Sequence, residues 1–383
     1  MRPDELTAAL AALDERQQRR RRVTLSSAQG RVIDVAGQSY LSFASNDYLG
    51  LANHPDLVSA AVEGAARWGI GSGASPLVTG HSDAHAEAET ALAAWLDLPA
   101  ALLFSSGFAA NLAVPCSLLG RGDAVFADRL NHASLNDACL LCRAEFHRFR
   151  HNDLDHLEHL LRTCRARTRL IAVDAVYSMD GDEAPLAGLL ELARRYDAWL
   201  YVDDAHGFGV LGGGRGSLAE CGLRDERIIY MATLGKAAGV AGAGVAASAE
   251  VIDWLINSAR SYIYSTAHPP MLAHVLSASL RLIESESWRR ERLQAHIARL
   301  RHALYDIGIV VGPSRTAIQP LIMGDNRKAL DMSLRLREMG LWVPAIRPPT
   351  VPAGSARLRV SLSAAHTPED IGRLIDEIAG DNL

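Results

Sequence analysis

Lys236 is the residue of this chain best suited to covalent chemistry. It stands in the segment TLGKAAGVAGAGVAA, whose small side chains would let a planar group approach the backbone closely. A lysine nucleophile must be partly desolvated to lose its proton, and this neighbourhood offers that. The P-loop pattern is excluded, because Tyr230 rather than Gly stands five residues before Gly235 and Ala follows the lysine. Taken alone, the segment is equally compatible with a surface lysine in a Gly/Ala loop.

The other lysine, Lys328, gives a useful contrast. The chain has 39 basic residues, and all except Lys236 and Lys328 are arginine. Arginine cannot become a neutral nucleophile near pH 7, whereas lysine can. Lys328 stands at the start of a helix-like segment, DNRKAL, and we expect it to be an ordinary solvated charge.

Three further groups of polar residues follow short apolar runs. Asp203 and His206 could serve a pyridoxal ring, because a carboxylate that keeps the pyridine nitrogen protonated makes that ring an electron sink. The segment SSGFAAN at 105–111 runs into a helix whose first N–H groups could bind a phosphate. His132 offers an imidazole that could stack on a ring or move a proton. For Asp203 and His206, the alternative is an aspartate that caps a helix and a histidine whose hydrogen bonds are satisfied. For segment 105–111 it is a turn that is common in α/β proteins, and for His132 it is a structural histidine in a loop.

Two other patterns are interpreted as structural. Four histidines crowd one arginine-rich segment at helical spacing, which predicts a solvated helix face rather than a metal site. They are His147, His151, His156 and His159. Cys139 and Cys142 form a single C-x-x-C pair in an apolar, helix-like run, which predicts core packing. We therefore expect no bound metal.

Candidate residues of this kind need a scaffold that brings them together. From about residue 100, short apolar runs alternate with helical stretches, which is typical of parallel strands buried on both faces and joined by crossover helices. The runs are 101–104, 124–127, 170–177, 198–202 and 228–232. The polar or small residues that end them include Ser105, Asp128, Ser178, Asp203 and Thr233. Ligands bind beyond the carboxyl ends of such strands, so these residues should converge on one crevice.

The two ends of the chain have a different pattern. Residues 4–18 predict an amphipathic helix that carries Leu6, Leu10 and Leu13 on one stripe and leads into the arginine run 19–22. A charged helical stretch near 281–305 precedes strand-like segments at 341–346 and 358–362 and a last helix that Thr367 caps.

The predicted fold class is α/β, with a large domain around a mainly parallel central sheet and a smaller C-terminal α+β domain. The predicted boundaries are 1–45 for an N-terminal helix and arm, 46–283 for the large domain and 284–383 for the small domain.

Composition excludes several classes of protein. With 383 residues, 49% hydrophobic residues and a net charge of −5, the chain can bury a large core and is not a disordered polyanion or polycation. It lacks the basic balance of a nucleic-acid binder and the apolar stretch of a membrane span. The N-terminus lacks the apolar region of a secretory signal, and five cysteines, an odd number, suggest reduced thiols. We expect a cytoplasmic protein with no nucleic-acid or membrane partner.

Taken together, the chain resembles the α-oxoamine synthases, a family of enzymes of fold type I that depend on pyridoxal 5'-phosphate (PLP). The resemblance extends from about residue 4 to the C-terminus. Its motifs are SNDYLG at 45–50, SSGFAAN at 105–111, NHAS at 131–134, VYSMDGD at 176–182, DDAHG at 203–207 and TLGK at 233–236.

The resemblance implies a role for each matching residue. It makes Lys236 the residue that binds PLP covalently and later removes the Cα proton, with Asp203 on the pyridine nitrogen and His132 stacked on the ring. The remaining PLP contacts that it implies are Gly107, Phe108, Ser178, His206 and Thr233, with Ser265 and Thr266 reaching the phosphate of a partner subunit in a homodimer. The substrate contacts that it implies are Arg20, Asn46, His132, Thr350 and Arg359.

The reaction that the resemblance implies is a decarboxylative condensation. Segment 345–359, AIRPPTVPAGSARLR, is similar to that of the biotin-pathway member, which joins L-alanine to a pimeloyl thioester and releases CO₂ and the thiol. The thioester could be pimeloyl-CoA or pimeloyl-acyl carrier protein. The alternatives are a sister synthase that uses glycine and acetyl-CoA, a PLP-dependent retro-aldolase, and a protein that binds PLP without catalysis.

Overall fold

The computed structural model describes residues 2–380, which form two compact units. The larger unit comprises Leu49–Ser178 and Asp182–Arg290. The described residues of the smaller unit are 2–48, 179–181 and 291–380. The domain boundaries predicted above stay a prediction, and the two units are described separately below.

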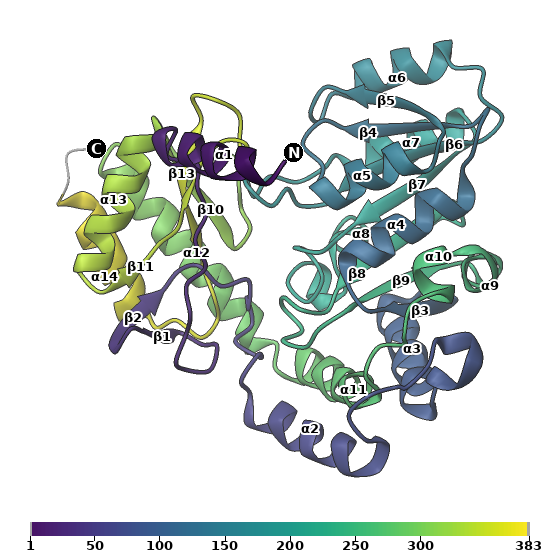
Figure 1. Ribbon diagram of the computed structural model, residues 1–383, viewed down its shortest axis with the longest axis horizontal. Coiled ribbons are helices and arrows are strands. Elements are labelled where there is room, and N and C mark those ends of the chain that lie inside the picture. The colour runs from purple at the N-terminus through teal and green to yellow at the C-terminus, as the bar shows by residue number, and fades with distance from the viewer. Residues whose placement is uncertain (1, 381–383) are drawn as a thin grey trace. The chain divides into compact units, whose positions relative to one another are not determined.

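A seven-stranded sheet forms the centre of the larger unit (Figure 1). Its strand order is β3-β9-β8-β7-β6-β4-β5, and β9 is the only described strand of this sheet that runs antiparallel to its neighbours. The strands are β3 (Ala100–Phe104), β4 (Ala124–Asp128), β5 (Glu145–Phe149), β6 (Arg169–Asp174), β7 (Ala198–Asp203), β8 (Ile228–Thr233) and β9 (Ala243–Ala247). This sheet confirms the predicted mainly parallel architecture.

Helices cover both faces of this sheet, which explains why its strands are apolar on both sides. The helices of the larger unit are α2 (Pro55–Trp68), α3 (Asp83–Leu96), α4 (Gly107–Leu118), α5 (Ala133–Leu141), α6 (Leu154–Thr163), α7 (Leu186–Arg195), α8 (Ser217–Glu220), α9 (Ala249–Ser258), α10 (Arg260–Ile263) and α11 (Pro270–Ser285). Helices α4, α5, α9 and α10 contact one another as one layer, while α11 packs on α2 and α3. Cys139 and Cys142 are buried in the core beside α5, as predicted.

The structure corrects two of the predicted segments of this sheet. The interpretation of 147–159 as a solvated helix face is wrong for His147 and His151, because 145–149 is strand β5 and His151 lies in the loop before α6. The run 170–177 is a strand only as far as Asp174, and Val176 instead forms an isolated antiparallel bridge with Glu183. The sequence analysis also did not predict β9, whose Gly- and Ala-rich sequence resembles a loop.

The smaller unit contains two three-stranded sheets and four helices among its described residues. The sheets have the orders β1-β2-β11 and β10-β13-β12. The strands are β1 (Val32–Val35), β2 (Gln38–Ser42), β10 (Ile318–Gly324), β11 (Leu341–Trp342), β12 (Ala345–Ile346) and β13 (Ala356–Ser361), and the helices are α1 (Pro3–Glu15), α12 (Trp288–Asp306), α13 (Asn326–Glu338) and α14 (Pro368–Ala379). The predicted strand at 358–362 corresponds to β13, but the segment 341–346 is divided between β11 and β12, which belong to different sheets. The sequence analysis did not predict β1, β2 or β10.

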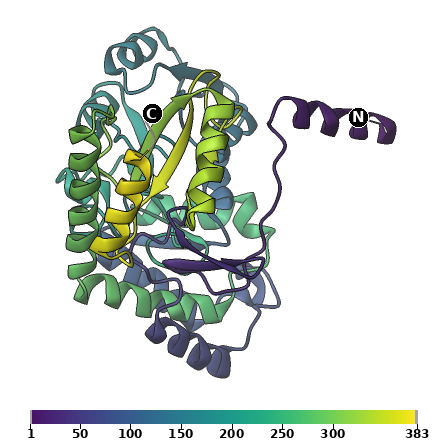
Figure 2. The same cartoon turned by 90° about the vertical axis from the view of Figure 1, so that its left-hand side faces the viewer.

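Three of the smaller unit's helices agree with features that the sequence predicted. Thr367 caps α14 by accepting the backbone N–H of Asp370 at 3.3 Å, and Lys328 is exposed in the first turn of α13. Helix α1 carries the predicted leucine stripe but buries none of its residues, and Figure 2 shows it at the end of an extended segment.

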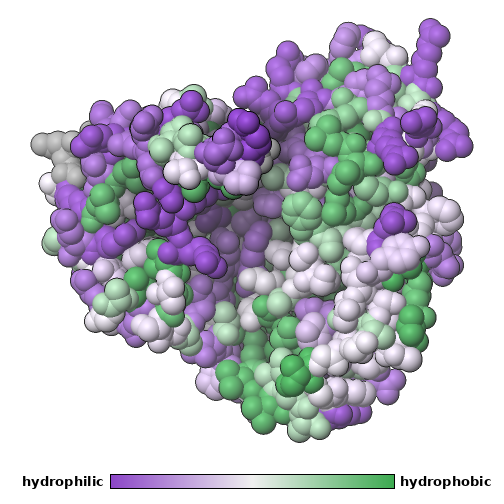
Figure 3. All heavy atoms as spheres, viewed as in Figure 1, coloured by the Kyte–Doolittle hydropathy of each residue, from purple (hydrophilic) through white to green (hydrophobic). Residues whose placement is uncertain are grey.

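Surface hydropathy varies over the larger unit. In Figure 3 apolar side chains gather near α2 at the lower edge of the view, where Val58 and Val62 are exposed, and hydrophilic side chains gather near α6. None of the helices within residues 2–380 has the length and apolar character that crossing a membrane requires.

The loop after β7 is organised around Asp204, which is fully buried. Its carboxylate accepts hydrogen bonds from the backbone N–H and the hydroxyl of Ser217, both at 2.6 Å, and from the Tyr230 hydroxyl at 2.8 Å. Burial raises the pKa of Asp204 to about 6, and these hydrogen bonds limit the rise. Neighbouring side chains of an extended chain point in opposite directions, so Asp204 stabilises the loop while Asp203 is free to point elsewhere.

We expect Gly207→Ala to unfold the loop after β7. A Cβ atom at Gly207 would lie 2.2 Å from Oδ1 of Asp204 and 2.4 Å from the Ser217 hydroxyl, so the buried network would have to open. The loss should exceed about 2 kcal/mol of unfolding free energy in urea denaturation. Gly120→Ala is the matched control, because its Cβ would meet no atom within 4 Å. Equal stability of the two variants would contradict this account of the loop.

Candidate active site

A pocket opens in the larger unit where its central strands end. Residues that end or follow the three strands β6, β7 and β8 line it, together with residues from the starts of α4 and α5. The lining residues are Gly107, Phe108, Asn111, His132, Ser134, Asp174, Val176, Ser178, Asp203, Ala205, His206, Met231, Thr233 and Lys236. The structure thus brings together eight of the residues expected to bind a cofactor, and these eight come from segments up to 129 positions apart in the chain (Gly107 to Lys236).

Lys236 lies in the hairpin that joins β8 to the antiparallel β9. Hydrogen bonds from Leu234 N–H to the Gly242 carbonyl and from Val240 N–H to the Leu234 carbonyl, both 2.9 Å, close this hairpin. The Lys236 amine lies 2.8 Å from Nε2 of His206, which belongs to the loop after β7. The amine therefore has a nitrogen partner that can share a proton with it inside the pocket.

Asp203 supplies a buried carboxylate to the same pocket. It ends β7, is 5% exposed, and accepts hydrogen bonds from the Asn111 amide at 2.8 Å and from the Ala205 N–H at 3.0 Å. Asn111 is itself oriented, because its carbonyl oxygen accepts the Tyr201 hydroxyl at 2.7 Å and its amide also donates to the Ser134 hydroxyl. A carboxylate oriented in this way can accept one more donor from a bound ring.

His132 caps α5 and presents its imidazole to the pocket. Its Nδ1 lies 2.7 Å from the Ser134 hydroxyl and accepts the Ser134 N–H at 3.3 Å. Burial lowers the pKa of His132, and the charge of Asp203 only partly opposes that effect. The two contacts with Ser134 fix the orientation of the imidazole through its Nδ1, and a neutral imidazole in a fixed orientation is suited to stacking on a flat ring.

Asp174 is a residue of the pocket that the sequence analysis missed. One oxygen, Oδ2, accepts the backbone N–H of His132 at 3.0 Å, while the buried Oδ1 has no hydrogen-bond partner among the described residues. Asp174 is also the register partner of Asp203 on the neighbouring strand. Burial and the charge of Asp203 both raise the pKa of Asp174 well above its usual value, which favours the neutral form of this carboxyl group.

The start of α4 provides the pocket with backbone donors. Ser106 caps this 12-residue helix by accepting the Ala109 N–H at 3.1 Å, which leaves the first N–H groups, those of Gly107 and Phe108, for a ligand. Thr233 lies close by, with its side chain 3.8 Å from a Cβ built on Gly107, and its hydroxyl donates to the Gly242 carbonyl at 3.2 Å. This end of the pocket can hold a phosphate.

Of the five residues expected to bind substrate, His132 lines the pocket of the larger unit, and the other four form two pairs within the smaller unit. The buried Arg359 of β13 donates to the Asn46 side-chain oxygen at 3.2 and 3.3 Å and to the Ser361 hydroxyl at 2.7 Å. Arg20 donates to the Thr350 hydroxyl at 2.7 Å on the surface of this unit. Ser265 and Thr266, between α10 and α11 of the larger unit, are not among the residues that line the pocket.

Asn111, Ser134 and Asp174 line the pocket although none was named as a candidate. A signal for Asn111 was present, because it stands four residues after Gly107 and therefore on the same face of the helix that begins at the phosphate end. Asp174 was hidden by the apolar residues that follow it, which made the strand seem longer.

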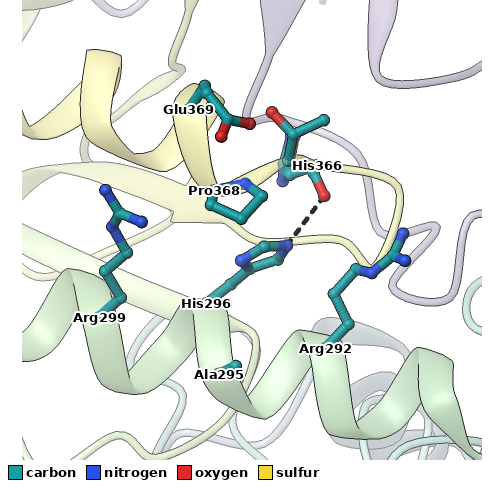
Figure 4. Close-up of a pocket in the computed structure, with 8 residues that line it drawn as sticks. Arg292, Ala295, His296, Arg299, His366, Pro368 and Glu369 are labelled. Carbon is teal, nitrogen blue, oxygen red and sulfur yellow. Dashed lines mark hydrogen bonds between the residues drawn. The ribbon is translucent and has the colours of Figure 1, made fainter.

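A second pocket lies within the smaller unit, between α12 and the start of α14 (Figure 4). In Figure 4 Arg292 and Arg299 lie on either side of His296. His296 donates its Nε2–H to the His366 carbonyl at 2.9 Å, which ties α12 to the loop before α14. We interpret the second pocket as a gap in the packing between α12 and α14, and we assign no ligand to it.

The chemistry of the larger unit's pocket fits PLP, the cofactor that the sequence resemblance implies. A buried carboxylate can hold a pyridinium N–H, a neutral imidazole can stack on the ring, and a lysine amine can bond to an aldehyde carbon. The unpartnered Oδ1 of Asp174 and the first N–H groups of α4 are polar groups that a bound ligand would have to satisfy.

Comparisons with known proteins agree with this geometry. The aminotransferase class I and II family matches residues 38–378. A curated relative from Chromobacterium violaceum is 62% identical over 376 residues, covering 98% of each chain, and one from Nitrosomonas europaea is 58% identical over 371 residues, covering 95% of this chain and 96% of the relative. A solved serine palmitoyltransferase from S. paucimobilis with bound PLP is 29% identical with a TM-score of 0.92, and the match covers 98% of this chain and 96% of the other.

The chain belongs to the aminotransferase class I and II family, and the predicted fold type I is confirmed. Both of these curated relatives carry the name 8-amino-7-oxononanoate synthase.

The neutral state of Asp174 can be tested by Asp174→Asn. A buried acid whose pKa is raised in the folded protein contributes stability at low pH that is lost as pH rises above the unfolded pKa. The uncharged amide lacks this dependence, so at pH 8 the variant should melt at the wild-type temperature or a few degrees above it. Thermal melting from pH 5 to pH 9 measures both the melting temperature and its change with pH. A large loss of stability at pH 8 would show instead that Asp174 is needed as an anion.

Proposed function

We propose that this chain is a PLP-dependent 8-amino-7-oxononanoate synthase of biotin biosynthesis, which condenses L-alanine with a pimeloyl thioester. The observation that carries the proposal is the single pocket that joins Lys236, His206, Asp203 and His132 in a chain with relatives of that name at up to 62% identity. In the reaction, alanine Cα forms a bond to the thioester carbonyl carbon, the C–S bond breaks to release the thiol, and the alanine carboxyl group leaves as CO₂.

PLP supplies an electron sink for the negative charge that develops at the substrate's Cα. The role of the pocket is to present this cofactor and to move protons around it. Lys236 would hold the cofactor through its amine, and once that amine is free it would take the Cα proton of the substrate on Nζ. His206, 2.8 Å from this amine, accepts or returns a proton at Nε2.

The other pocket residues orient and tune the site. Asp203 keeps the ring nitrogen protonated, and the amide of Asn111 keeps the Asp203 carboxylate in position. His132 stacks on the ring, and Ser178 hydrogen-bonds near the ring oxygen. The N–H groups of Gly107 and Phe108, with the hydroxyl of Thr233, hold the phosphate. The Asp203 carboxylate is 5% exposed, and such burial strengthens its interaction with a bound ring.

Arg359 and Arg20 are the proposed substrate residues. A buried arginine with a planar fork suits a carboxylate, and Arg359 already has its orientation set by Asn46 and Ser361. We assign it the carboxylate of alanine. Arg20 and Thr350 contact the acyl substrate, supported by their mutual hydrogen bond of 2.7 Å.

The proposal extends to assembly and location. The enzyme acts as a cytoplasmic homodimer in which Ser265 and Thr266 reach the phosphate held by the partner subunit, and this is supported by their absence from the lining of their own pocket. The pimeloyl group arrives on CoA or on an acyl carrier protein. Light scattering of the purified protein tests the dimer, and a comparison of pimeloyl-CoA with pimeloyl-acyl carrier protein tests the donor.

Lys236→Ala should abolish covalent binding of PLP. The wild-type protein should show a visible absorbance band and become labelled when PLP and borohydride are added, because the lysine amine bonds to the aldehyde. The variant should lose both signals, and Lys328→Ala serves as the matched control that keeps them. Labelling that survives in the Lys236 variant but disappears in the Lys328 variant would overturn the assignment.

Asp203→Asn should leave PLP bound but slow loss of the Cα proton by orders of magnitude. The neutral amide cannot hold the ring nitrogen protonated, so the negative charge at Cα loses its sink. The measurement is the rate of exchange of the Cα proton of L-alanine for deuterium, followed by NMR. An exchange rate near that of the wild type would contradict the role of Asp203.

Product analysis tests the substrates. Incubation with L-alanine and pimeloyl-CoA should give 8-amino-7-oxononanoate, detected by mass spectrometry, with one CO₂ and one thiol for each product molecule. Glycine and acetyl-CoA form the control pair. A product from the control pair alone would establish the sister synthase instead, and cleavage of a hydroxy amino acid without any thioester would establish a retro-aldolase.

A further inference from the structure

A half-buried cluster of charged side chains lies in the larger unit, and none of its members lines the pocket. His151, in the loop between β5 and α6, lies between two carboxylates. Its Nδ1 is 3.0 Å from Oδ1 of Asp128, and its Nε2 is 2.7 Å from Oδ2 of Asp182. The edge of its ring meets the Tyr177 ring with 4.4 Å between centroids.

These contacts require both ring nitrogens of His151 to carry protons. A carboxylate oxygen only accepts hydrogen bonds, so each imidazole nitrogen that faces one must donate. A neutral imidazole has a single N–H and would leave one of the two contacts repulsive. The arrangement is satisfied by an imidazolium between two anions, one of which, Asp128, is 0% exposed.

The cluster holds together two segments that lead into the pocket. On one side, Asp128 accepts the N–H of Leu130 at 2.8 Å and thereby shapes the turn that ends at His132. On the other side, the backbone N–H of Tyr177 donates to the Asp182 carbonyl at 3.0 Å, and Tyr177 directly precedes Ser178. His151 is therefore three bonded or hydrogen-bonded steps from Ser178 and four from His132, and both of these residues line the pocket.

Asn152 completes the cluster on the same loop. Its backbone N–H donates to Oδ2 of Asp128 at 2.8 Å, and its side-chain amide donates to Oδ2 of Asp182 at 3.1 Å and to the Glu183 carbonyl at 3.2 Å. The loop between β5 and α6 thus binds both segments through two consecutive residues. Nothing else in the sequence of this loop indicates a link to the site.

We propose that protonated His151 is a positioning residue for the cofactor site: it clamps the segment that carries His132 to the segment that carries Ser178, and loss of its proton releases the clamp. The inference rests on the proposed function, since it concerns how the pocket binds PLP.

The electrostatic surroundings of His151 support the proposal. Burial alone would lower the pKa of His151, but the hydrogen bonds to Asp128 and Asp182, and the charges of both, raise it to about 9. Those two carboxylates and the Tyr177 ring are the titratable groups that face it from β4 and from the segment after β6. A folded-state pKa above the unfolded value means that the contribution to stability is complete below about pH 6.5 and is lost as pH rises through about 9.

The first test is a titration of the full-length protein labelled with ¹³C in its histidine rings. The His151 resonance is assigned by its absence from His151→Gln, and it should titrate near pH 9 in the wild type. Asp182→Asn removes one anionic acceptor and should move this midpoint to lower pH. A His151 midpoint near 6.5 in the wild type would overturn the proposal, and this measurement does not depend on PLP.

The second test is the dissociation constant of PLP from pH 6.5 to pH 10. His151→Gln should weaken PLP binding about tenfold at pH 7.5, and the wild-type affinity should fall toward that of the variant above pH 9. In Asp182→Asn the fall should begin at lower pH, which keeps the test decisive if the His151 variant does not fold. Titration of Lys236 is common to all of these proteins and cancels in the comparison.

Leu157→Ala is the matched control for a purely structural effect. Leu157 is fully buried one turn further along α6, so its truncation lowers the melting temperature without touching the clamp. It should keep the PLP affinity and the pH profile of the wild type. If His151→Gln behaves like this control, the positioning role is overturned. If the wild type binds no PLP at any pH, the proposed function fails, while the titration still decides the charge of His151.

Discussion

Buried negative charge at the ends of three neighbouring strands is the constraint on which the rest of this site depends. β4, β6 and β7 lie side by side and end in Asp128, Asp174 and Asp203. Three anions so close together in a low-dielectric interior would repel one another strongly, so each requires its own compensation. Asp203 has the oriented amide of Asn111, Asp128 has the imidazolium of His151, and at Asp174 burial and the charge of Asp203 raise the pKa and favour the neutral form.

These three solutions divide the work of the pocket. Only Asp203 remains available as an anion that faces a ligand, because the charge of Asp128 is neutralised by a histidine outside the pocket. A neutral Asp174 avoids competition with Asp203 for a single cationic group while it still holds the backbone of His132. The sheet therefore brings three carboxyl groups to one edge, and the residues around them leave Asp203 as the anion that faces the pocket.

Much of this arrangement was predictable from the sequence, for reasons that particular residues make clear. Apolar runs that end in polar residues located Asp203, Asp128 and Thr233, because the strand ends of a parallel sheet meet at one edge. Asp174 was missed because the three residues that follow the end of its strand are also apolar.

The strands β5 and β9 were missed because β5 is polar and lies at the edge of the sheet, while β9 is made of Ala, Gly and Val. His151 could not be recognised, because its partners stand 23 and 31 positions away. The roles of Arg359 and Thr350 came only from family resemblance.

The antiparallel strand β9 has a consequence for the evolution and redesign of this protein. Residues 234–242 are the turn of a hairpin, and the pairing of Thr233 with Ala243 sets the register on both sides of it. Most connections in an α/β protein tolerate insertions, because a crossover helix absorbs the change in length. Here one added residue would have to bulge out of the turn or slip a whole strand, which would exchange the two faces of β9. The spacing around Lys236 is therefore tied to the register of β8 and β9, and redesign for new substrates has more freedom in the loops of the pocket that lead into helices.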